Sequence, residues 1–497
     1  MIFRKGTRSS GETAAGDVNT LIQDAGPPGR PLSAPTVLSF SAAALPLWAL
    51  AVAVAVYLPA YFASHLGVSL GVIGVAWAVV RFLDIAVDPA LGMVMDRTRT
   101  RFGRYRVWLM IGAPILMASV YALFLAPAGI GAAYLIGWLF VLYLGISIVT
   151  LAHLAWAATL ATEYHQRSRV FGVVATVGVL GAVAVLMIPI AAGASGRSDA
   201  EGVQAMGWFI FWLVPISVVL VCLRTPEHIA PVREGAHLNL KDLWALLVKP
   251  DLVRLVLAQM ALTLGPGWMS ALYLFFFTDA RGYTSEQASI LLLIYVVAGI
   301  AGAPATARLA MRFGKHRTLM VTTTAYSLGL CTILFLPKAS MAAGIPMMFW
   351  CGFMAAGFDL MIRAMLADVG DEVRLDQGQE QISLIYALNT LAAKIAAAFA
   401  IVLTFPLLGW LGYVAAEGAT NTPAAIRSLE FTFILGPIVF VMLGGACVIG
   451  WRLDAGRHAD IRRQLDERDA QYAEAPILES LTAQPAIAVL AEDGKPG

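Results

Sequence analysis

The stretch RFLDIAVDPALGMVMDRTRTRFGRYR, residues 81–106, places carboxylates where a membrane-spanning helix is expected and follows them with a block of arginines. It comes directly after the apolar run GVIGVAWAVV, residues 71–80. Asp84 and Asp88 therefore fall inside a hydrophobic segment, where inserting a charged side chain costs at least ~2.5 kcal/mol. The arginines behind them are typical of a loop that stays in the cytoplasm. The stretch thus predicts a membrane protein with a charged site inside the bilayer.

The composition of the chain is that of a membrane protein. Of its 497 residues, 59% are hydrophobic and 13% are charged, and the mean hydropathy is +0.75. Soluble globular proteins carry about 25% charged residues, so this chain has too little charge to cover a soluble surface. The predicted fold class is an all-α membrane protein with many spans. The net charge of +2 gives no indication of a nucleic-acid partner, because the basic residues lie in short loops.

Catalytic and metal-binding patterns are missing from the sequence. The four cysteines lie in or beside apolar segments without CxxC spacing, which favours small buried side chains over a metal or redox site. We find no nucleophile–base pair, phosphate-binding loop or metal cluster. We therefore expect neither an enzyme nor a resident cofactor.

Apolar runs long enough to cross a bilayer, about 20 residues each, recur twelve times. The loops DRTRTRFGRYR, EYHQRSR and RFGKHRT are basic, whereas the loops between them carry almost no lysine or arginine. The positive-inside rule places the basic loops and both termini in the cytoplasm. The loop at 368–381 is acidic although the alternation places it on that side. The predicted spans are residues 36–63, 69–95, 106–126, 131–162, 168–193, 205–224, 252–279, 285–312, 317–336, 342–367, 380–413 and 426–452.

An internal echo divides the chain into two halves. RFGRYRVWLM begins at Arg101 after the second span, and RFGKHRTLMV begins at Arg312 after the eighth. Matching loops at matching places indicate duplication, which is typical of a common transporter architecture. The predicted units are a flexible cytoplasmic tail at 1–35, a six-helix bundle at 36–224, a cytoplasmic middle loop with an amphipathic helix at 225–251, a second six-helix bundle at 252–452 and a cytoplasmic tail at 453–497.

We single out six charged residues within the predicted spans, and each is a functional candidate by default. Asp84 and Asp88 are four residues apart and lie on one helical face about 6 Å from each other. Two carboxylates at such a short distance repel each other in a low dielectric, so a proton or a metal ion can bind between them. The alternative is a structural network with Arg81, three residues earlier on the same face. The remaining three are Asp359, Arg363 and Lys394.

Other polar residues offer partners to these charges. Ser147 and Thr150 are spaced i, i+3 in the fourth span and present hydroxyls on one face, although such hydroxyls often bond to their own backbone carbonyls. Lys394, in the middle of a span, either pairs with an acid, titrates or extends toward the membrane surface. Asp359 and Arg363 are spaced i, i+4 and either neutralise each other or serve a solute.

The residues quoted above resemble a known family. RFLDIAVDPALGMVMDRTRTRFGRYRVWLMIGAP resembles the second-helix signature of the glycoside–pentoside–hexuronide cation symporters, the melibiose permease group of the major facilitator superfamily. The loop EYHQRSR and the stretch AMLADVGDEVRLDQGQEQISLIYALNTLAAKIAAAFA resemble later parts of the same family. The resemblance covers nearly all of the membrane region and excludes both tails.

The resemblance implies twelve helices in two six-helix bundles around a central cavity. It implies symport of a sugar, glycoside or related small organic solute, coupled to Na⁺ or H⁺, by a monomer in the cell membrane, which in a bacterium is the inner membrane. It also implies roles for residues at matching positions. These are a cation site of Asp84, Asp88, Ser147 and Thr150; coupling by Lys394 and Arg81; solute contacts from Trp48, Tyr57, Asp359, Tyr386, Asn389 and Thr390; and a cytoplasmic gate of Asp96, Arg97, Arg101 and Arg104.

Several positions depart from the family pattern. Trp48 stands where melibiose permease has a first-helix aspartate that holds the sugar, Thr150 stands at a fourth-helix aspartate, and Asp359 stands at a tenth-helix tryptophan. The cation residues are thus partly retained while the galactoside ligands are largely lost. A site without those hydrogen-bond partners binds a galactoside poorly, which favours a different sugar, a glycoconjugate or a more amphipathic solute.

Two alternatives stay open. One is a carrier of lipids, lysolipids or other amphipathic solutes with the same fold. The other is a membrane sensor or scaffold that transports nothing and binds a partner through the tail RHADIRRQLDERDAQYAEAP at 457–476. The pattern of that tail is amphipathic only in part and predicts a solvated helix.

Overall fold

The computed structural model describes residues 32–98, 100, 103–160, 164–227, 249–335, 337–377 and 381–468. Within them, twelve helical segments are long and apolar enough to cross a membrane, which confirms the twelve predicted spans. The predicted tail up to residue 31, the amphipathic piece at 238–248 and Arg101 lie outside the described residues.

The first half contains six spans. The first of them is built from four consecutive pieces: α2 (Ala34–Ser41), α3 (Ala44–Val52), the π-helical turn η1 (Ala53–Tyr57) and α4 (Leu58–Ser64). The other five are α5 (Leu70–Arg97), α6 (Tyr105–Phe124), α7 (Ala132–Leu160), α8 (Tyr164–Ala194) and α9 (Asp199–Arg224).

The second half repeats this arrangement. Its first span continues into a π-helical turn, as α11 (Pro250–Phe275) and η2 (Phe276–Ala280). The rest of the half consists of α12 (Ser285–Phe313), α13 (Lys315–Thr332), the 3₁₀ turn η3 (Ile333–Phe335), α14 (Met341–Gln377), α15 (Ile382–Trp410) and α16 (Pro423–Ala446).

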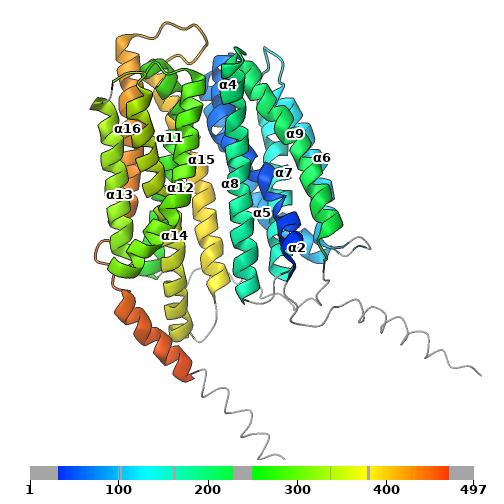
Figure 1. The fold of residues 1–497 in the computed structure, drawn as a ribbon, viewed down its shortest axis with the longest axis vertical. Helices are drawn as coiled ribbons and strands as arrows, with labels where there is room; N and C mark the ends of the chain where they lie inside the picture. Colours follow the sequence, from blue (N-terminus) through cyan, green and yellow to red (C-terminus); the bar gives the residue numbers. More distant parts are fainter. Residues whose placement is uncertain are drawn as a thin grey trace, which may run out of the picture.

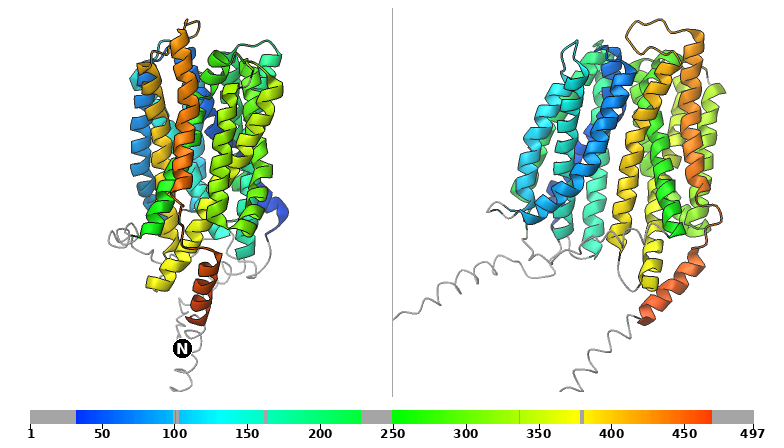
Figure 2. Two further views of the ribbon diagram at one scale, coloured as in Figure 1. Left: turned by 90° about the vertical axis from the view of Figure 1, so that its left-hand side faces the viewer. Right: turned by 180° about the vertical axis from the view of Figure 1, so that it is seen from behind.

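The two halves stand side by side, with the first half on the right and the second on the left of Figure 1. The start of α2 and a last helix at 455–468 lie at the same end of the molecule, as an even number of spans requires (Figures 1 and 2). We call this end the tail side and the opposite end the far side. Four of the helices that start on the far side, α5, α9, α12 and α16, begin at hydroxyl caps that bond to their first backbone N–H groups.

The two halves meet at the centre and on the far side. The helices in contact across the interface are α5 with α15, α8 with α12, and η1 and α4 with α11. The hydrogen bonds and ion pairs that join described residues of the two halves lie at these two levels. Between described residues, none joins the tail-side ends of the halves. The molecule is therefore closed on the far side.

α14 differs most from its prediction. The predicted span ended at residue 367, but the helix continues to Gln377, so the acidic segment is helical rather than a loop. The reason is that its carboxylates find basic partners: Lys315 lies 2.6 Å from Asp368, and Lys249 lies 2.7 Å from Asp376. At 1.5 Å per residue, a helix of 37 residues is longer than a bilayer core is thick. α14 therefore projects on the tail side.

The tail beyond the last span also differs from its prediction. Residues 455–468 form a helix, but it is not solvated on all sides. Ile461 and Leu465 are fully buried, whereas the residues between them are exposed. The apolar residues are too few to predict this docking from the sequence, and the surface that receives them, α14, was itself predicted to end earlier.

Candidate functional site

The second-span aspartates lie on α5, which runs without interruption from Leu70 to Arg97 although it contains Pro89. Arg81, Asp84 and Asp88 fall at i, i+3 and i+7 and so share one face. That face is turned toward α15 of the other half and α7 of the same half, the two helices that α5 contacts most. The helical periodicity of the sequence thus brings all three charges to the interface between the halves.

Lys394 of α15 joins this face and binds both aspartates. Its Nζ lies 3.1 Å from Asp84 Oδ2 and also contacts Asp88 Oδ2. Ser147 Oγ of α7 donates a hydrogen bond of 2.8 Å to Asp84 Oδ1. Arg81 Nη1 lies 3.9 Å from Asp84 Oδ2. We call Arg81, Asp84, Asp88, Ser147 and Lys394 the central cluster.

The charges of the central cluster balance, but its hydrogen bonds are incomplete. Two carboxylates face one ammonium and one guanidinium, and the Asp84 side chain is 3% exposed. Asp88 Oδ1 and Arg81 Nε are buried without a hydrogen-bond partner among the described residues. A buried acceptor without a partner is costly. Among the described residues, Asp88 Oδ1 is thus a carboxylate oxygen of the cluster that is left without a partner.

The two hydroxyls of the fourth span, on Ser147 and Thr150, differ in their hydrogen bonds. Ser147 bonds to Asp84 and not to its own backbone, so the self-bonding alternative is wrong for this residue. Thr150 is half-buried and makes no side-chain hydrogen bond with a described residue. Four residues were predicted to bind the cation, and the structure brings three of them together. Asp84 and Asp88 share Lys394, and Ser147 bonds directly to Asp84.

The predicted solute contacts on the second half form a group around α14 and α15. Arg363 Nε lies 2.6 Å from Asp359 Oδ2, and both side chains are more than half exposed. Tyr386 donates to the Arg363 carbonyl at 3.0 Å, and Thr390 donates to the Tyr386 carbonyl at 2.9 Å. Asn389 is instead buried and donates to Gln259 of α11 at 3.3 Å. Asn389 thus faces away from the group.

The two candidates from the first span lie apart from that group. Trp48 is 44% exposed and lies close to Gly178 of α8. Tyr57 is buried and donates a hydrogen bond of 2.8 Å to Ser289 of α12. Tyr57 therefore joins the two halves on the far side.

The predicted gate is described only in part. The side chain of Asp96 and all of Arg101 lie outside the described residues, so the latch between them stays a prediction. Arg97 is exposed, and Arg104 donates to the Met95 carbonyl at 3.2 Å.

Glu227, three residues after α9, was missed by the sequence reasoning. Its carboxylate accepts from the backbone N–H groups of Arg104, Tyr105 and Arg106 at 2.7, 2.5 and 3.3 Å. These are the first N–H groups of α6, where a negative charge is favourable. One feature of the sequence could have indicated this role for Glu227. The start of α6 has no hydroxyl cap of its own, and Glu227 is an acid in a loop on the same side.

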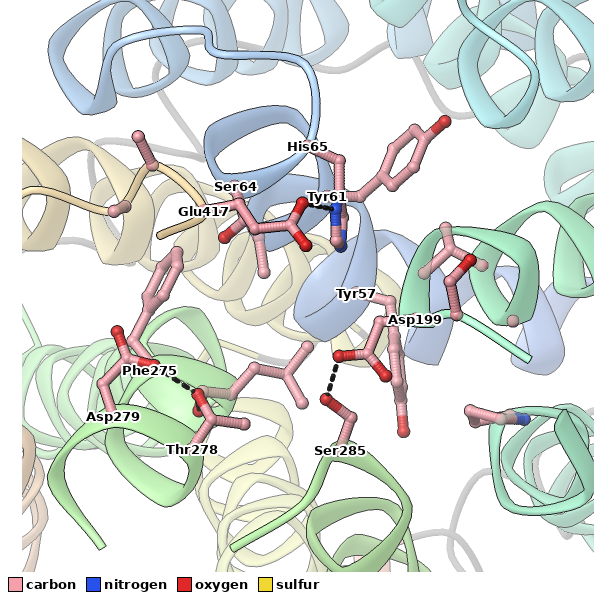
Figure 3. Close-up of a pocket in the computed structure, with 18 of the residues that line it drawn as sticks. Tyr57, Tyr61, Ser64, His65, Asp199, Phe275, Thr278, Asp279, Ser285 and Glu417 are labelled. Atoms are coloured by element: carbon pink, nitrogen blue, oxygen red, sulfur yellow. Dashed lines mark hydrogen bonds and ion pairs between the residues drawn. The ribbon is translucent and has the colours of Figure 1, made fainter. Parts of the chain in front are cut away.

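A polar pocket of about 290 Å³ lies between the halves on the far side (Figure 3). Ser285 donates to Asp199, and His65 Nδ1 lies 2.7 Å from Glu417 Oε2, so both contacts join the two halves. The Glu417 N–H also donates to the Ser64 carbonyl at 3.1 Å. These contacts close the far side. These far-side contacts could not be predicted from the sequence because each of them joins residues that are distant in the chain.

Asp279 at the end of η2 adds a further far-side contact. It accepts from Thr278 at 2.7 Å and from the Tyr413 hydroxyl. Burial, with the nearby Asp279 carboxylate, raises the pKa of Tyr413. The Tyr413 hydroxyl therefore stays protonated and holds the loop after α15 against η2.

Comparison with known proteins gives one consistent result. The profile of the family described as MFS/sugar transport protein matches residues 39–455. The uncharacterized symporter YnaJ of Bacillus subtilis is 23% identical over 84% of this chain and 92% of its own length. The isoprimeverose transporter of Lactiplantibacillus pentosus is 24% identical over 81% of this chain and 85% of its own. The nucleoside transporter NupG shares the fold, with a TM-score of 0.63 at 12% identity over 84% of this chain and all of that one.

Proposed function

This chain belongs to the MFS/sugar transport protein family of the major facilitator superfamily, and from that premise we propose that it is a symporter driven by a cation. It is a multi-pass membrane protein of a secondary-transporter family, and its curated relatives are bacterial symporters and sugar carriers. The proposed cargo is a sugar, glycoside or related small organic solute together with Na⁺ or H⁺. The proposed setting is the inner membrane of a bacterium.

The observation that carries the proposal is the central cluster. Lys394 of the second half holds Asp84 and Asp88 of the first half, and one carboxylate oxygen of Asp88 has no partner among the described residues. A positive ion that binds the carboxylates competes with the Lys394 ammonium. Because the two charges come from different halves, replacing the ammonium by an ion changes how strongly the halves attract each other at the centre.

Alternating access follows from this competition. With Lys394 in place the halves are joined at the centre and on the far side. An ion at Asp84 and Asp88 would free Lys394, weaken the central attraction and let the halves rock about the midplane. If the solute prefers the ion-bound arrangement, each ligand raises the affinity of the other by the same factor.

The orientation and the units follow the same proposal. Basic loops flank the tail side, so we assign the tail side to the cytoplasm and describe the structure as inward-facing. The units at 36–224 and 252–452 are then the two rocking bundles, and the segments 1–35, 225–251 and 453–497 are cytoplasmic. A monomer is sufficient, because both bundles are in one chain.

The solute contacts are proposed from exposure and chemistry. Arg363 uses Nε for Asp359 and leaves the rest of its guanidinium exposed, and the Trp48 ring offers a flat apolar face. Hydroxyls and a sugar ring face suit such groups. Asn389, which is buried against α11, is proposed to support this group rather than to touch the solute.

The test is uptake by inverted and right-side-out membrane vesicles under an imposed Na⁺ or pH gradient. A panel of labelled pentosides, hexosides, uronides and lysolipids covers both solute classes. Accumulation of one class above its equilibrium level, abolished when the gradient is collapsed, is the expected result. Equal uptake with and without each gradient for every solute would contradict cation coupling.

A further inference from the structure

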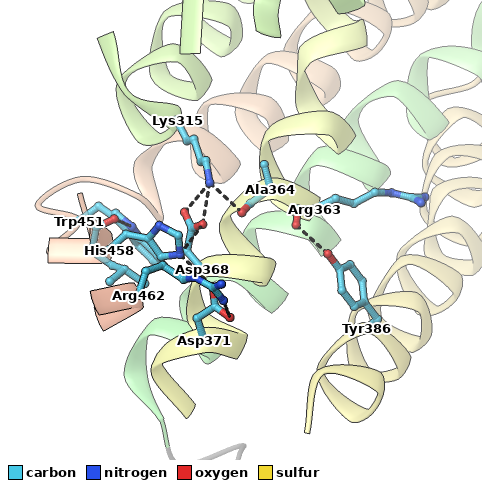
Figure 4. Close-up of polar contacts among 10 residues, drawn as sticks. Lys315, Arg363, Ala364, Asp368, Asp371, Tyr386, Trp451, His458 and Arg462 are labelled. Carbon is cyan, nitrogen blue, oxygen red and sulfur yellow. Dashed lines mark hydrogen bonds and ion pairs between the residues drawn. The ribbon is translucent and has the colours of Figure 1, made fainter. Parts of the chain in front are cut away.

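The last helix, 455–468, is docked onto the tail-side end of α14. Its buried residues Ile461 and Leu465 lie one turn apart. Two other side chains of this helix form ion pairs with the Asp371 carboxylate of α14. His458 Nε2 lies 3.0 Å from Asp371 Oδ2, and Arg462 Nη1 lies 3.4 Å from Asp371 Oδ1 (Figure 4). Arg468 donates to two carbonyls in the last turn of α14, at 3.1 and 3.3 Å. A basic side chain at a helix C-terminus is favourable.

The start of α13 meets the same place on α14. Lys315 Nζ lies 2.6 and 2.7 Å from the two oxygens of Asp368 and donates to the Ala364 carbonyl at 3.2 Å. His458 Nε2 also lies 3.4 Å from Asp368 Oδ1. The segment 364–371 of α14 is therefore held by α13 and by the last helix together.

Arg363, the residue before segment 364–371, connects α14 to α15. The carbonyl of Arg363 accepts a hydrogen bond of 3.0 Å from Tyr386, as Figure 4 shows on the other side of α14. Tyr386 lies two turns before Lys394 on the same helix. A shift of the tail-side end of α14 is thus passed on to the helix that carries Lys394.

The corresponding place in the first half is fixed differently. There Glu227, just after α9, accepts directly from the first N–H groups of α6. In the second half the first acid after α16 is Asp454, eight residues beyond the end of that helix, and it accepts from the Arg457 N–H at 2.9 Å. Asp454 thus caps the start of the last helix. That helix in turn contacts Asp368, the residue that binds Lys315 at the start of α13, through His458.

The contacts of the last helix suit a reversible attachment. Arg462 is 46% exposed and His458 is 27% exposed, and partly exposed ion pairs are individually weak. All described partners of this helix belong to the second half. It therefore restrains α14 without tying the two halves together.

We propose that helix 455–468 is a cytoplasmic strap that stabilises the inward-facing arrangement by holding the end of α14, with Arg462 and His458 as its positioning residues. The direction of the effect rests on the proposed function, because the inward side is assigned there. The strap sets how readily α14 and α15 move when the cytoplasmic side closes. Neither positioning residue touches the solute or the ion.

The test measures the far-side opening directly. Ser64 lines the far-side pocket, so Ser64→Cys reports that opening by its reaction with a membrane-impermeant maleimide, in a background where the exposed Cys331 is replaced by serine. We expect Arg462→Glu to raise the labelling rate about two- to fivefold, the range of one partly exposed ion pair. Ile461→Asp, which removes a buried anchor, is expected to raise it further.

The matched control is Arg463→Glu. Arg463 lies next to Arg462 but pairs with Asp460 of its own helix, so this variant changes the same charge without touching α14. Arg462→Lys is expected to restore the wild-type labelling rate, and the turnover rate for the solute should change in Arg462→Glu while its KM does not. Equal labelling in Arg462→Glu, Ile461→Asp and Arg463→Glu would overturn the strap.

The two proposals fail in distinguishable ways. Labelling needs neither solute nor ion, so a faster reaction in Arg462→Glu together with uptake that ignores every gradient would retain the strap and reject cation coupling. Gradient-driven uptake together with equal labelling in all variants would retain cation coupling and reject the strap.

Discussion

Two clusters built from the same groups lie at different depths of the molecule. In the cluster on the tail side, Lys315 bonds to both oxygens of Asp368, and all described partners belong to the second half. In the central cluster, Lys394 is shared between Asp84 and Asp88 of the other half, and one oxygen of Asp88 is buried with no partner in the described part of the chain.

Under the proposed function, the difference separates a structural ion pair from one that takes part in coupling. A pair that is complete within one half keeps its partners when the halves move. A pair that spans the interface must be broken or rearranged by the same motion, and an unmet acceptor gives an ion a place to bind. We therefore expect substitutions in the central cluster to affect coupling strongly and substitutions on the tail side to affect it weakly.

The largest effect is expected for Asp88→Asn. The amide keeps the size of the side chain but removes the charge that an ion would bind, so gradient-driven accumulation should fall by at least about tenfold, the scale of a typical coupling free energy. Vesicle uptake under an imposed gradient measures it. Asp376→Asn is the matched control, since Asp376 pairs with Lys249 outside the interface. Equal losses in both variants would remove the distinction between the clusters.

Lys394→Met is expected to act in a different direction. Without the ammonium, Arg81 is the one described cation left beside Asp84 and Asp88, so an ion should bind about tenfold more tightly, the effect of removing one nearby opposite charge. The concentration of Na⁺ or H⁺ that half-saturates thermal stabilisation of the purified protein measures this affinity. Lys315→Met should leave it unchanged. Weaker ion binding in Lys394→Met would refute the competition.

A smaller effect is expected for Ser147→Ala, which removes the hydroxyl that donates to Asp84. One hydrogen bond to a buried carboxylate is worth about 1 kcal/mol net, so the ion affinity should change about three- to tenfold. The same stabilisation assay applies. Thr150→Val is the control, and an equal change in both variants would argue that Ser147 has no special place in the cluster.

How far the site could be predicted depends on whether its residues share one helix. The face of α5 followed from spacing alone, because Arg81, Asp84 and Asp88 repeat with the period of a helix. The partnership with Lys394 followed from the family resemblance, since no local pattern relates residues about 300 positions apart. The pairing of Ser147 with Asp84 had the same origin.

The parts that were missed rest on contacts between segments distant in the sequence. His65 meets Glu417 and Asp199 meets Ser285 only because the far-side loops of the two halves come together. The extension of α14 was missed because its acids looked unsuited to a helix until Lys315 neutralised one of them. Such contacts depend on the tertiary arrangement of the helices and leave little trace in local patterns.

A further effect is expected on the far side, from Tyr57→Phe. The variant removes one buried hydrogen bond to Ser289, which keeps a second partner in the Ser285 carbonyl. The loss of about 1 kcal/mol should raise maleimide labelling of Ser64→Cys about fivefold. Tyr121→Phe is the control, because the Tyr121 hydroxyl bonds to no described residue. Equal labelling in both would show that Tyr57 does not hold the far side closed.

The most direct measurement of the central claim is solute binding with and without a saturating concentration of the coupling ion, in the wild type and in Asp88→Asn. We expect the ion to tighten solute binding in the wild type by about tenfold or more and the solute to tighten ion binding by the same factor. In Asp88→Asn the factor should fall to about one. The same factor in both proteins would contradict the assignment of the coupling site to Asp84 and Asp88.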